Sequence, residues 1–436
     1  MTIAEVLEAT RYQSYIYAYP HKTAYRPLSS RPLRDVWANE RRGSLFLYVH
    51  VPFCEQRCGF CNLFTRPVPP EDTIAAYLAT LARQVAVVRR ALDDGGAFAF
   101  ARAAIGGGTP TLLDAHQLER VMALVDEMGA SRVPMSVETS PETALPDRLA
   151  VLVGGGADRI SMGIQSFVEA EARAVNRPQR TADVHAALRA IRDANPATLN
   201  VDLMYGLPGQ TEATWASSLH GALEYRPEEI YLYPLYVRPL TTLGRKGARA
   251  VDAHRVALYE QGRETLVEAG YRQISMRMFR RGEFPAAPVY ACQDDGMVGL
   301  GCGARSYTRA LHYSTEWAVG ARSIRDIIDR WIERDDAAFA VADYGFALDA
   351  TEQRRRWLIL SLLADEGLDL AGYHAKFGGD AHTEFPELAE LPPHGLAVRD
   401  AATLRLTPEG LAHADAIGPW LASDAVRARM AEFALT

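Results

Sequence analysis

The stretch YVHVPFCEQRCGFCNLFTR, residues 48–66, decides how the rest of the chain is interpreted. It contains Cys54, Cys58 and Cys61, three of the five cysteines in the protein, at C-x3-C-x2-C spacing. Thiolates are soft anionic ligands, so three of them this close together can converge on one metal centre. Iron–sulfur cubanes are usually held by four cysteines. A cubane held by three has one iron open, and that iron can bind a small molecule and pass it an electron.

Two other interpretations of the three cysteines stay open at this point. The first is a tetrahedral zinc site, but zinc ribbons and fingers carry a second ligand pair further along the chain. Neither a second C-x2-C nor an H-x3-H follows in this sequence. The second is three incidental thiols, which is disfavoured because random cysteines at this abundance rarely cluster so tightly.

Composition limits the classes of protein that are possible. The chain has 436 residues, 48% hydrophobic and 23% charged, as expected for one large globular domain and a smaller one. A net charge of −7 argues against broad nucleic-acid binding. No apolar run approaches about 20 residues, and the N-terminus lacks an apolar signal segment, so neither membrane insertion nor export is expected. Five cysteines suit a reducing compartment, and we expect a cytoplasmic protein.

From about residue 44 the pattern alternates between buried strands and amphipathic helices. The strands are expected at 44–51, 101–107, 135–140, 158–167, 198–206 and 229–237, and the helices at 72–92, 114–128, 142–156, 181–194 and 211–225. Asp114 is a plausible N-cap for the second helix. Such alternation predicts an α/β fold with a parallel sheet and helices outside it. Six units are too few for a closed eight-stranded barrel, so we expect a partial (β/α)6 barrel with its site at the carboxyl ends of the strands.

The chain divides into three expected regions. Residues 1–43 are rich in Tyr and Arg and interrupted by prolines, which favours an arm packed on the main body. The alternative is a lid whose aromatic and basic groups touch an anionic substrate. Residues 44–310 form the barrel. Residues 311–436 are expected to be a small, mainly helical, winged-helix-like domain with an accessory structural role, because such a fold alone does not imply DNA binding.

The cysteine spacing after a first strand, with Phe60 just before the last cysteine, resembles the radical S-adenosylmethionine (SAM) superfamily. The resemblance implies a [4Fe-4S] cluster whose open iron is chelated by the amino and carboxylate groups of SAM. An electron from the cluster then cleaves SAM to methionine and a 5′-deoxyadenosyl radical. It also implies an electron donor such as flavodoxin or ferredoxin.

Further segments narrow the resemblance. YVHVPFC, AIGGGTPT, SVETSPE, RISMGIQSF, NRPQ and LNVDLMYGLPGQT occur in the order of the oxygen-independent coproporphyrinogen III dehydrogenase (HemN-like) family. The similarity runs from about residue 12 to at least residue 310 and extends toward the C-terminal domain. It implies two SAM molecules in one site, with the N-terminal arm lying over them.

The resemblance assigns most site residues, and their chemistry is compatible with the assignment. Glycines let a backbone approach a ligand closely, Arg pairs with a carboxylate, and Asp pairs with an ammonium or a ribose. The cluster ligands are Cys54, Cys58 and Cys61. Residues assigned to the first SAM are Tyr48, Gly107 and Glu138. Residues assigned to the second SAM are Phe60, Gly108, Thr109, Gln165, Arg177 and Asp202. The catalytic candidates are His50, Tyr48, Arg305 and Tyr307, with His50 a possible proton donor or substrate contact.

Two departures from the family pattern bear on the reaction. Coproporphyrinogen dehydrogenases proper carry a further cysteine two residues after the third, where this chain has Leu63. Family members that are haem chaperones or methylases lack it too. In addition, the segments at 231–243 and 299–308 are rich in Tyr and Arg, which indicates specialisation toward another substrate. The residues that carry this signal are Tyr233, Tyr236, Arg238, Arg305 and Tyr307.

These departures favour one reaction and leave two alternatives open. The leading hypothesis is methyl or methylene transfer from the second SAM to a small molecule, as in HemN-like methylases and cyclopropanases. The second is oxidative decarboxylation of coproporphyrinogen III in haem biosynthesis. The third is a haem-binding or haem-trafficking protein without turnover. Cys292 and Cys302 receive no role, because small buried cysteines are more common than reactive ones.

Overall fold

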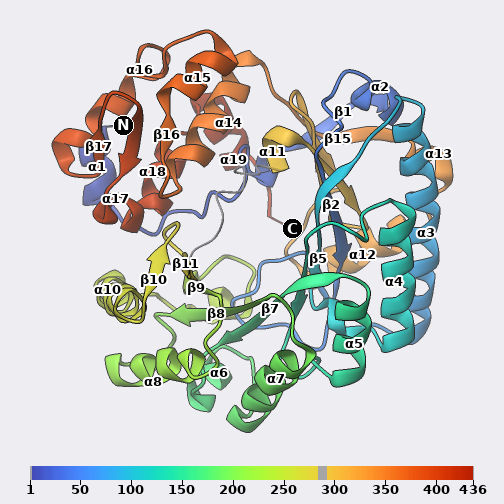
Figure 1. Ribbon diagram of the computed structural model, residues 1–436, viewed down its shortest axis with the longest axis horizontal. Coiled ribbons are helices and arrows are strands. Elements are labelled where there is room, and N and C mark those ends of the chain that lie inside the picture. The colour runs from blue at the N-terminus through green and yellow to red at the C-terminus, as the bar shows by residue number, and fades with distance from the viewer. Residues whose placement is uncertain (1, 283–291, 436) are drawn as a thin grey trace.

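The computed structural model describes residues 2–282 and 292–435. Six strands at its centre lie side by side in chain order, and every neighbouring pair is parallel. The six are β2 (Leu45–Val51), β5 (Phe100–Gly107), β6 (Met135–Thr139), β7 (Ala157–Gln165), β8 (Thr198–Tyr205) and β9 (Glu229–Pro234). The predicted partial barrel is therefore confirmed, and Figure 1 shows it as a curved, open sheet.

Helices between the strands cover the outside of this sheet (Figure 1). They are α3 (Glu71–Asp93), α4 (Ala115–Glu127), α5 (Pro146–Gly154), α6 (Glu169–Ala174), α7 (Thr181–Ala194) and α8 (Glu212–Leu223), followed by α10 (Asp252–Glu268) after β9. The predicted alternation is correct, but the short helix α6 was not anticipated. Helix α5 begins at Pro146 and not at residue 142, because residues 140–145 form a turn in which the Ser140 carbonyl accepts from the amides of Thr143 and Ala144.

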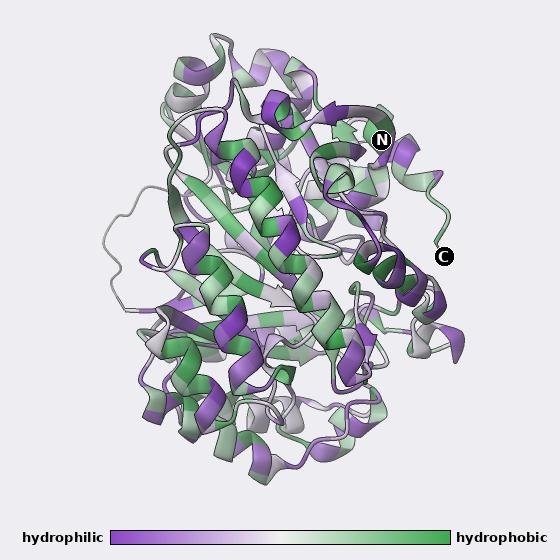
Figure 2. Ribbon diagram, turned by 90° about the vertical axis from the view of Figure 1, so that its right-hand side faces the viewer, coloured by the Kyte–Doolittle hydropathy of each residue, from purple (hydrophilic) through white to green (hydrophobic). Residues whose placement is uncertain are grey.

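Local chemistry explains why the helices start and stop where they do. Asp114 caps α4 as predicted: its side chain accepts from the Gln117 amide at 2.8 Å, and Gln117 returns a bond to the Asp114 amide. Helix α7 ends at Asn195 in the left-handed conformation, with φ of 55°. The helices seen in Figure 2 carry alternating hydrophilic and hydrophobic bands, as expected where one face packs on a sheet.

The sheet continues beyond the barrel on both sides, to thirteen strands. On one side β12 (Met297–Leu300) is parallel to β2, and antiparallel strands follow: β13 (Arg305–Tyr307), β14 (Leu311–Ser314), β15 (Val341–Ala347) and β1 (Arg26–Pro32). On the other side lie β11 (Met278–Arg281) and β10 (Tyr271–Gln273). The expected boundaries at residues 43/44 and 310/311 therefore fall between strands of one sheet. Some of these pairings join distant parts of the chain, such as β12 with β2 and β1 with β15, and no local pattern encodes them.

The N-terminal region packs on both the barrel and the C-terminal region. It contains α1 (Ile3–Glu8), the 3-10 turn η1 (Lys22–Ala24), β1 and α2 (Leu33–Trp37). Ile3, Val6, Ile16 and Tyr19 are buried in the core of the C-terminal region, whereas Tyr12 is buried in the core of the barrel. The arm therefore bridges two hydrophobic cores, in agreement with the expected packed arm.

The C-terminal region begins with helices that cover the far part of the sheet, α12 (Ala321–Ile332) and α13 (Asp336–Phe339). After β15 the chain is mainly helical around a three-stranded antiparallel sheet, as the winged-helix-like expectation requires. Its helices are α14 (Ala350–Leu362), α15 (Leu370–Phe377), α16 (Ala381–Glu384), η3 (Pro386–Glu390), η4 (Pro392–His394), α17 (Pro408–Ala412), α18 (Ala414–Trp420) and α19 (Asp424–Ala431). Its strands, in spatial order, are β16 (Leu368–Asp369), β18 (Thr403–Leu406) and β17 (Ala397–Arg399).

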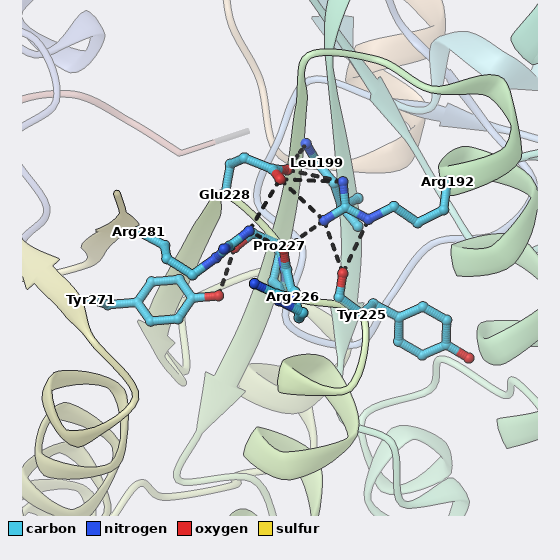
Figure 3. A network of polar contacts seen from close by, with 8 residues as sticks. All are labelled: Arg192, Leu199, Tyr225, Arg226, Pro227, Glu228, Tyr271 and Arg281. Carbon is cyan, nitrogen blue, oxygen red and sulfur yellow. Dashed lines mark hydrogen bonds and ion pairs between the residues drawn. The ribbon is translucent and has the colours of Figure 1, made fainter. Parts of the chain in front are cut away.

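Glu228 links the amino-terminal ends of the last barrel strands through hydrogen bonds and ion pairs (Figure 3). Its carboxylate accepts from the Leu199 amide at 2.8 Å, from Arg192 at 3.0 Å and from Arg281 at 3.3 Å. These partners come from β8, α7 and β11. The network holds the floor of the barrel, at the end of the strands opposite to the predicted site.

Candidate active site

The three cysteines lie on the loop between β2 and α3, at the carboxyl end of the barrel. Two short parallel strands, β3 (Phe53–Cys54) and β4 (Arg66–Pro67), close this loop on itself. The Arg66 amide donates to the Pro52 carbonyl at 2.6 Å, and the Val68 amide donates to the Cys54 carbonyl at 2.8 Å. All three cysteines are free thiols. We refer to residues 53–68 as the cysteine loop.

Hydrogen-bond donors reach two of the three sulfurs from elsewhere in the barrel. Thr109 Oγ1 lies 3.7 Å from Cys54 Sγ, and Arg177 Nη1 lies 3.2 Å from Cys58 Sγ. Burial raises the pKa of the Cys54 and Cys61 thiols, so bare thiolates are costly there. A bound metal centre would offset that cost, because coordinated thiols are deprotonated. The donors and the burial together fit a thiolate-held cluster.

In the part of the chain that the structure describes, no three His, Cys, Asp or Glu side chains converge as they would around a single metal ion. A cubane does not require such convergence, because each cysteine ligand binds a different iron. The three cysteines on one closed loop therefore remain suitable ligands for a [4Fe-4S] cluster.

The glycine turn after β5 lies directly against the cysteine loop. The Gly108 amide donates to the Val51 carbonyl at 2.8 Å, and the Thr109 amide donates to the Phe53 carbonyl at 2.7 Å. A Cβ atom on Gly108 would lie 2.8 Å from Cys54 Sγ and would also collide with the Phe53 carbonyl. Glycine is needed at this position because the two backbones are in contact.

We expect Gly108→Ala to displace the cysteine loop and to reduce cluster loading severalfold. The added methyl group has no space between Phe53 and Cys54, and backbone atoms cannot move aside as a flexible side chain can. Iron and sulfide content after anaerobic reconstitution measures the effect. Gly154→Ala is the control, since no atom lies within 4 Å of its Cβ position and its φ is not positive. Full loading of Gly108→Ala would contradict this account of the turn.

Of the residues assigned to the first SAM, Gly107 and Glu138 lie at the ends of β5 and β6, whereas Tyr48 lies in the middle of β2. Gly107, with φ of 120°, donates its amide to Glu138 Oε2 at 2.9 Å. Burial raises the pKa of Glu138, and the Gly107 bond partly offsets that effect. Tyr48 lies on β2, which is separated from the Glu138 strand by β5. Burial and, to a smaller extent, the Glu138 charge raise the pKa of Tyr48. The structure thus joins Gly107 and Glu138 directly and places Tyr48 two strands from Glu138.

His50 is placed to orient its neighbours. Its Nε2 lies 3.2 Å from the Phe64 carbonyl, which can only accept, so Nε2 carries the hydrogen. Its Nδ1 then accepts from the Tyr48 hydroxyl at 3.1 Å. Burial lowers the pKa of His50 to about 4, so the ring is neutral near pH 7. A neutral ring whose hydrogen is committed to a backbone carbonyl does not favour the expected role of proton donor.

Three of the six residues assigned to the second SAM come from β7, β8 and the segment after α6, and the other three come from the cysteine loop and the glycine turn. Arg177 Nη2 donates to the Gly163 carbonyl at 2.6 Å, in addition to its contact with Cys58. Gln165 has φ of 71° at the end of β7, and Asp202 Oδ1 accepts from Asn200 at 2.7 Å. Phe60 packs in a small apolar cluster that contains Val175, Met204, Leu207, Leu235 and Leu243. Arg177 and Thr109 therefore contact sulfurs of the cysteine loop, whereas Phe60, within that loop, packs against the apolar cluster.

We expect the cofactor-free Asp202→Asn variant to lose less stability than the wild type when the pH is raised from 4 to 7. Burial raises the pKa of Asp202 from 3.8 to about 6, so the folded state holds this proton more tightly than the unfolded state. That contribution to stability is present below pH 4 and is lost as the pH rises through 6, a loss of up to about 3 kcal/mol in the wild type. The variant lacks this loss. Urea denaturation of both proteins at pH 4 and pH 7 measures this loss. If both proteins lost the same free energy of unfolding between the two pH values, the raised pKa of Asp202 would be contradicted.

The arm contributes basic and aromatic groups beside β13. Arg305 Nη1 donates to the Tyr17 hydroxyl at 3.2 Å, and its guanidinium lies 4.8 Å over the Tyr17 ring. Lys22 Nζ lies 4.0 Å over the ring of Trp317. Burial lowers the pKa of Lys22 to about 8, and the nearby Arg305 charge acts in the same direction. Neither Lys22 nor Arg305 has an ion-pair partner among residues 2–282 and 292–435.

Tyr307 plays a different part from Arg305. It is buried, and its ring packs 4.3 Å from that of His312 between centroids. The Arg305 guanidinium lies 5.8 Å over the Tyr307 ring. Tyr307 therefore packs against Arg305 and His312, and its contact with the substrate stays a prediction.

One group at the barrel mouth was not predicted from the sequence. Arg277 and Asp415 form a buried, two-pronged ion pair at 2.8 and 2.5 Å, with side chains 3% and 1% exposed. The Arg277 guanidinium lies 3.9 Å over the ring of Tyr15, and the Tyr236 hydroxyl donates to Asp415. The arm, the barrel and α18 therefore meet at Asp415. The partners are too far apart in the sequence for any spacing pattern to have indicated them.

Comparison with known proteins places these features in context. The model of the Radical SAM superfamily matches residues 48–220, and the model of the HemN C-terminal domain matches residues 348–413. Oxygen-independent coproporphyrinogen III oxidase of Paracoccus denitrificans is 28% identical over 419 residues, covering 90% of each chain. Heme chaperone HemW of Escherichia coli is 30% identical over 278 residues, covering 60% of this chain and 69% of the relative.

A solved structure agrees with the whole architecture. Coproporphyrinogen III oxidase (HemN) from Escherichia coli superposes with a TM-score of 0.82 at 24% identity, covering 94% of this chain and 97% of the other. The likeness shows that both chains share one fold. Among the described helices, none is long and apolar enough to cross a bilayer.

Proposed function

This chain belongs to the HemN-like family of the radical SAM superfamily, and we propose that it is an enzyme that cleaves SAM to oxidise an anionic small molecule. The observation that supports this proposal most directly is the cysteine loop, with Thr109 and Arg177 directed at its sulfurs. When bound, a [4Fe-4S] cluster on this loop supplies the electron that cleaves SAM. Two SAM molecules are part of the proposal, because the residues assigned to each lie at the same end of the barrel.

The chain's own residues would bind and orient these molecules. Glu138 is available to a ribose hydroxyl or an ammonium group beside Gly107, and Arg177 can pair with a carboxylate close to Cys58. Asp202 would act on the second SAM. The arm covers the barrel mouth and excludes water, which protects a carbon radical from side reactions. Arg305 and Lys22, both without an acidic partner in the described residues, would hold the negative charge of the substrate.

The expected methyl or methylene transfer is not supported by the comparisons. Two relatives that each match at least 90% of this chain are named oxygen-independent coproporphyrinogen III oxidases. Hydrogen abstraction of that type is the reaction we favour. The basic groups at the mouth are compatible with a carboxylate-bearing substrate. Methyl transfer remains testable in the same experiment.

A haem-trafficking function is the second candidate. It is favoured by the 30% identity to a protein named heme chaperone HemW. Leu63, at the position of the extra cysteine of the porphyrinogen enzymes, is 50% exposed on the cysteine loop. Haem chaperones of the family are also expected to lack the extra cysteine at this position, which supports the same candidate.

The experiment incubates anaerobically reconstituted protein with dithionite, methyl-labelled SAM and coproporphyrinogen III. We expect 5′-deoxyadenosine to form whichever of the two enzymatic reactions occurs. We expect coproporphyrinogen III to be consumed if it is the substrate. Methyl label in a product other than methionine, formed together with S-adenosylhomocysteine, would support methyl transfer. Haem binding without 5′-deoxyadenosine would support trafficking and overturn the enzymatic proposal.

A further inference from the structure

One stretch of the chain is positively charged, although the chain as a whole is negatively charged. The protein carries a net charge of −7, yet residues 230–251 contain Arg238, Arg245, Lys246 and Arg249 and no carboxylate. Most of this charge lies on residues 238–250, which follow β9 and include the short helix α9 (Thr242–Arg245). We call residues 238–250 the basic loop.

The basic loop is attached directly to the cysteine loop. The Leu243 amide donates to the Gly59 carbonyl at 2.9 Å, and the Gly59 amide donates to the Val175 carbonyl at 2.7 Å. Leu243 is buried in the same small apolar cluster against which Phe60 packs. Because Gly59 and Phe60 lie between Cys58 and Cys61, the basic loop touches the segment that separates two cluster ligands.

A second set of contacts gives the basic loop a defined shape. Thr241 Oγ1 donates to the Arg238 carbonyl at 2.7 Å and accepts from the Gly244 amide at 3.1 Å. A Cβ atom on Gly244 would collide with the Arg238 carbonyl, so the turn is closely packed. The basic side chains that follow this turn are therefore attached to a backbone of defined conformation.

The charges on the outer side of the loop face solvent. Arg245, Lys246 and Arg249 are exposed, and none of the three forms an ion pair with any residue that the structure describes. Arg238 differs, since its guanidinium lies 4.3 Å over the Tyr236 ring and within 3.5 Å of the Gln13 carbonyl. Arg238 belongs to the barrel mouth, and the other three cations form an outward patch.

We propose that Arg245, Lys246 and Arg249 are the docking surface for a small acidic electron-transfer protein of the flavodoxin type. The inference rests on the proposed function, which needs one electron per SAM cleaved. One electron leaves the flavin hydroquinone, which becomes the semiquinone, and is taken up by the cluster on the cysteine loop. Opposite charges steer such partners together and fix their orientation, and electron-transfer interfaces are small and transient. The patch meets these requirements because it adjoins the backbone between Cys58 and Cys61.

The first test measures binding alone, with oxidised flavodoxin and the full-length protein at low ionic strength. We expect R245E/K246E/R249E to bind flavodoxin at least about tenfold more weakly than wild type, and R245Q/K246Q/R249Q to be intermediate. The matched control is R34E/R90E/R120E, which reverses three exposed arginines on α2, α3 and α4. Wild-type binding should weaken with added salt. Equal binding by wild type and the first variant would overturn the proposal, as would equal loss in the control.

The second test compares two reductants in SAM cleavage. With flavodoxin hydroquinone, R245E/K246E/R249E should form 5′-deoxyadenosine at least about tenfold more slowly than wild type. With dithionite the two proteins should be equal, because dithionite needs no docking surface. An equal loss with both reductants would overturn the proposal and assign the loop to the SAM or substrate site.

The two tests separate failure of this inference from failure of the proposed function. If wild type cleaves no SAM with dithionite, the proposed function fails, while the binding experiment still decides whether flavodoxin uses this patch. Wild-type binding to RNA or to anionic vesicles that the first variant loses, with flavodoxin binding unchanged, would identify another occupant and overturn the inference.

Discussion

Cys58→Ala is expected to abolish both cluster loading and SAM cleavage. The substitution removes one of three sulfurs and the acceptor of Arg177 Nη1, which lies 3.2 Å from that sulfur. A cubane with two protein ligands is poorly held. Iron, sulfide and visible absorbance after anaerobic reconstitution measure loading, and 5′-deoxyadenosine measures turnover.

Cys302→Ala is the matched control for this prediction. Cys302 is also buried, but it lies between β12 and β13, where its sulfur is 4.0 Å from the Ile327 carbonyl. Its loss should remove some packing and leave iron content and turnover unchanged. Full iron content in Cys58→Ala, or zinc in place of iron and sulfide in the wild type, would refute the ligand assignment.

Asp415→Ala is expected to lower the free energy of unfolding by about 3–5 kcal/mol, because it strands the Arg277 charge in the interior. Arg277 and Asp415 are 3% and 1% exposed, so water cannot replace the lost carboxylate. The same carboxylate accepts from Tyr236, and the Asp415 carbonyl accepts from the Ser14 amide of the arm. Urea denaturation measures the loss.

Two companions make this second prediction specific. Asp424→Ala removes a carboxylate that is 97% exposed and paired with Arg427, and it should change stability by less than about 1 kcal/mol. Arg277→Met/Asp415→Leu replaces both charges by apolar groups and should recover most of the loss. A small effect for Asp415→Ala, or no recovery in the double variant, would contradict the description of Asp415 as the meeting point of three regions.

The barrel could be predicted from the sequence because its signals are local. Strand β2 and helix α3 each show their own periodicity, and Asp114 and Gln117 form a cap within four residues. The outer strands could not be predicted in the same way. Gly299 on β12 must be glycine because a Cβ there would collide with the Arg305 backbone, a contact that appears only after the sheet has formed.

The same distinction applies to the site. The spacing of Cys54, Cys58 and Cys61 lies within one loop and was sufficient to predict a cluster site there. The partners that complete the mouth are distant: Tyr17 and Arg305 are separated by 288 residues, and Arg277 and Asp415 by 138. Individual Tyr and Arg residues were noticed as unusual, but their pairing depends on how the arm crosses the barrel.

The order of the thirteen strands has a consequence for biosynthesis. β1, made from residues 26–32, completes the sheet by pairing with β15 at residues 341–347. During translation this early segment must wait until more than three hundred further residues have left the ribosome. Pairings of such long sequence separation slow folding and leave strand edges open to other chains. Nascent protein should therefore depend on chaperones until β15 emerges.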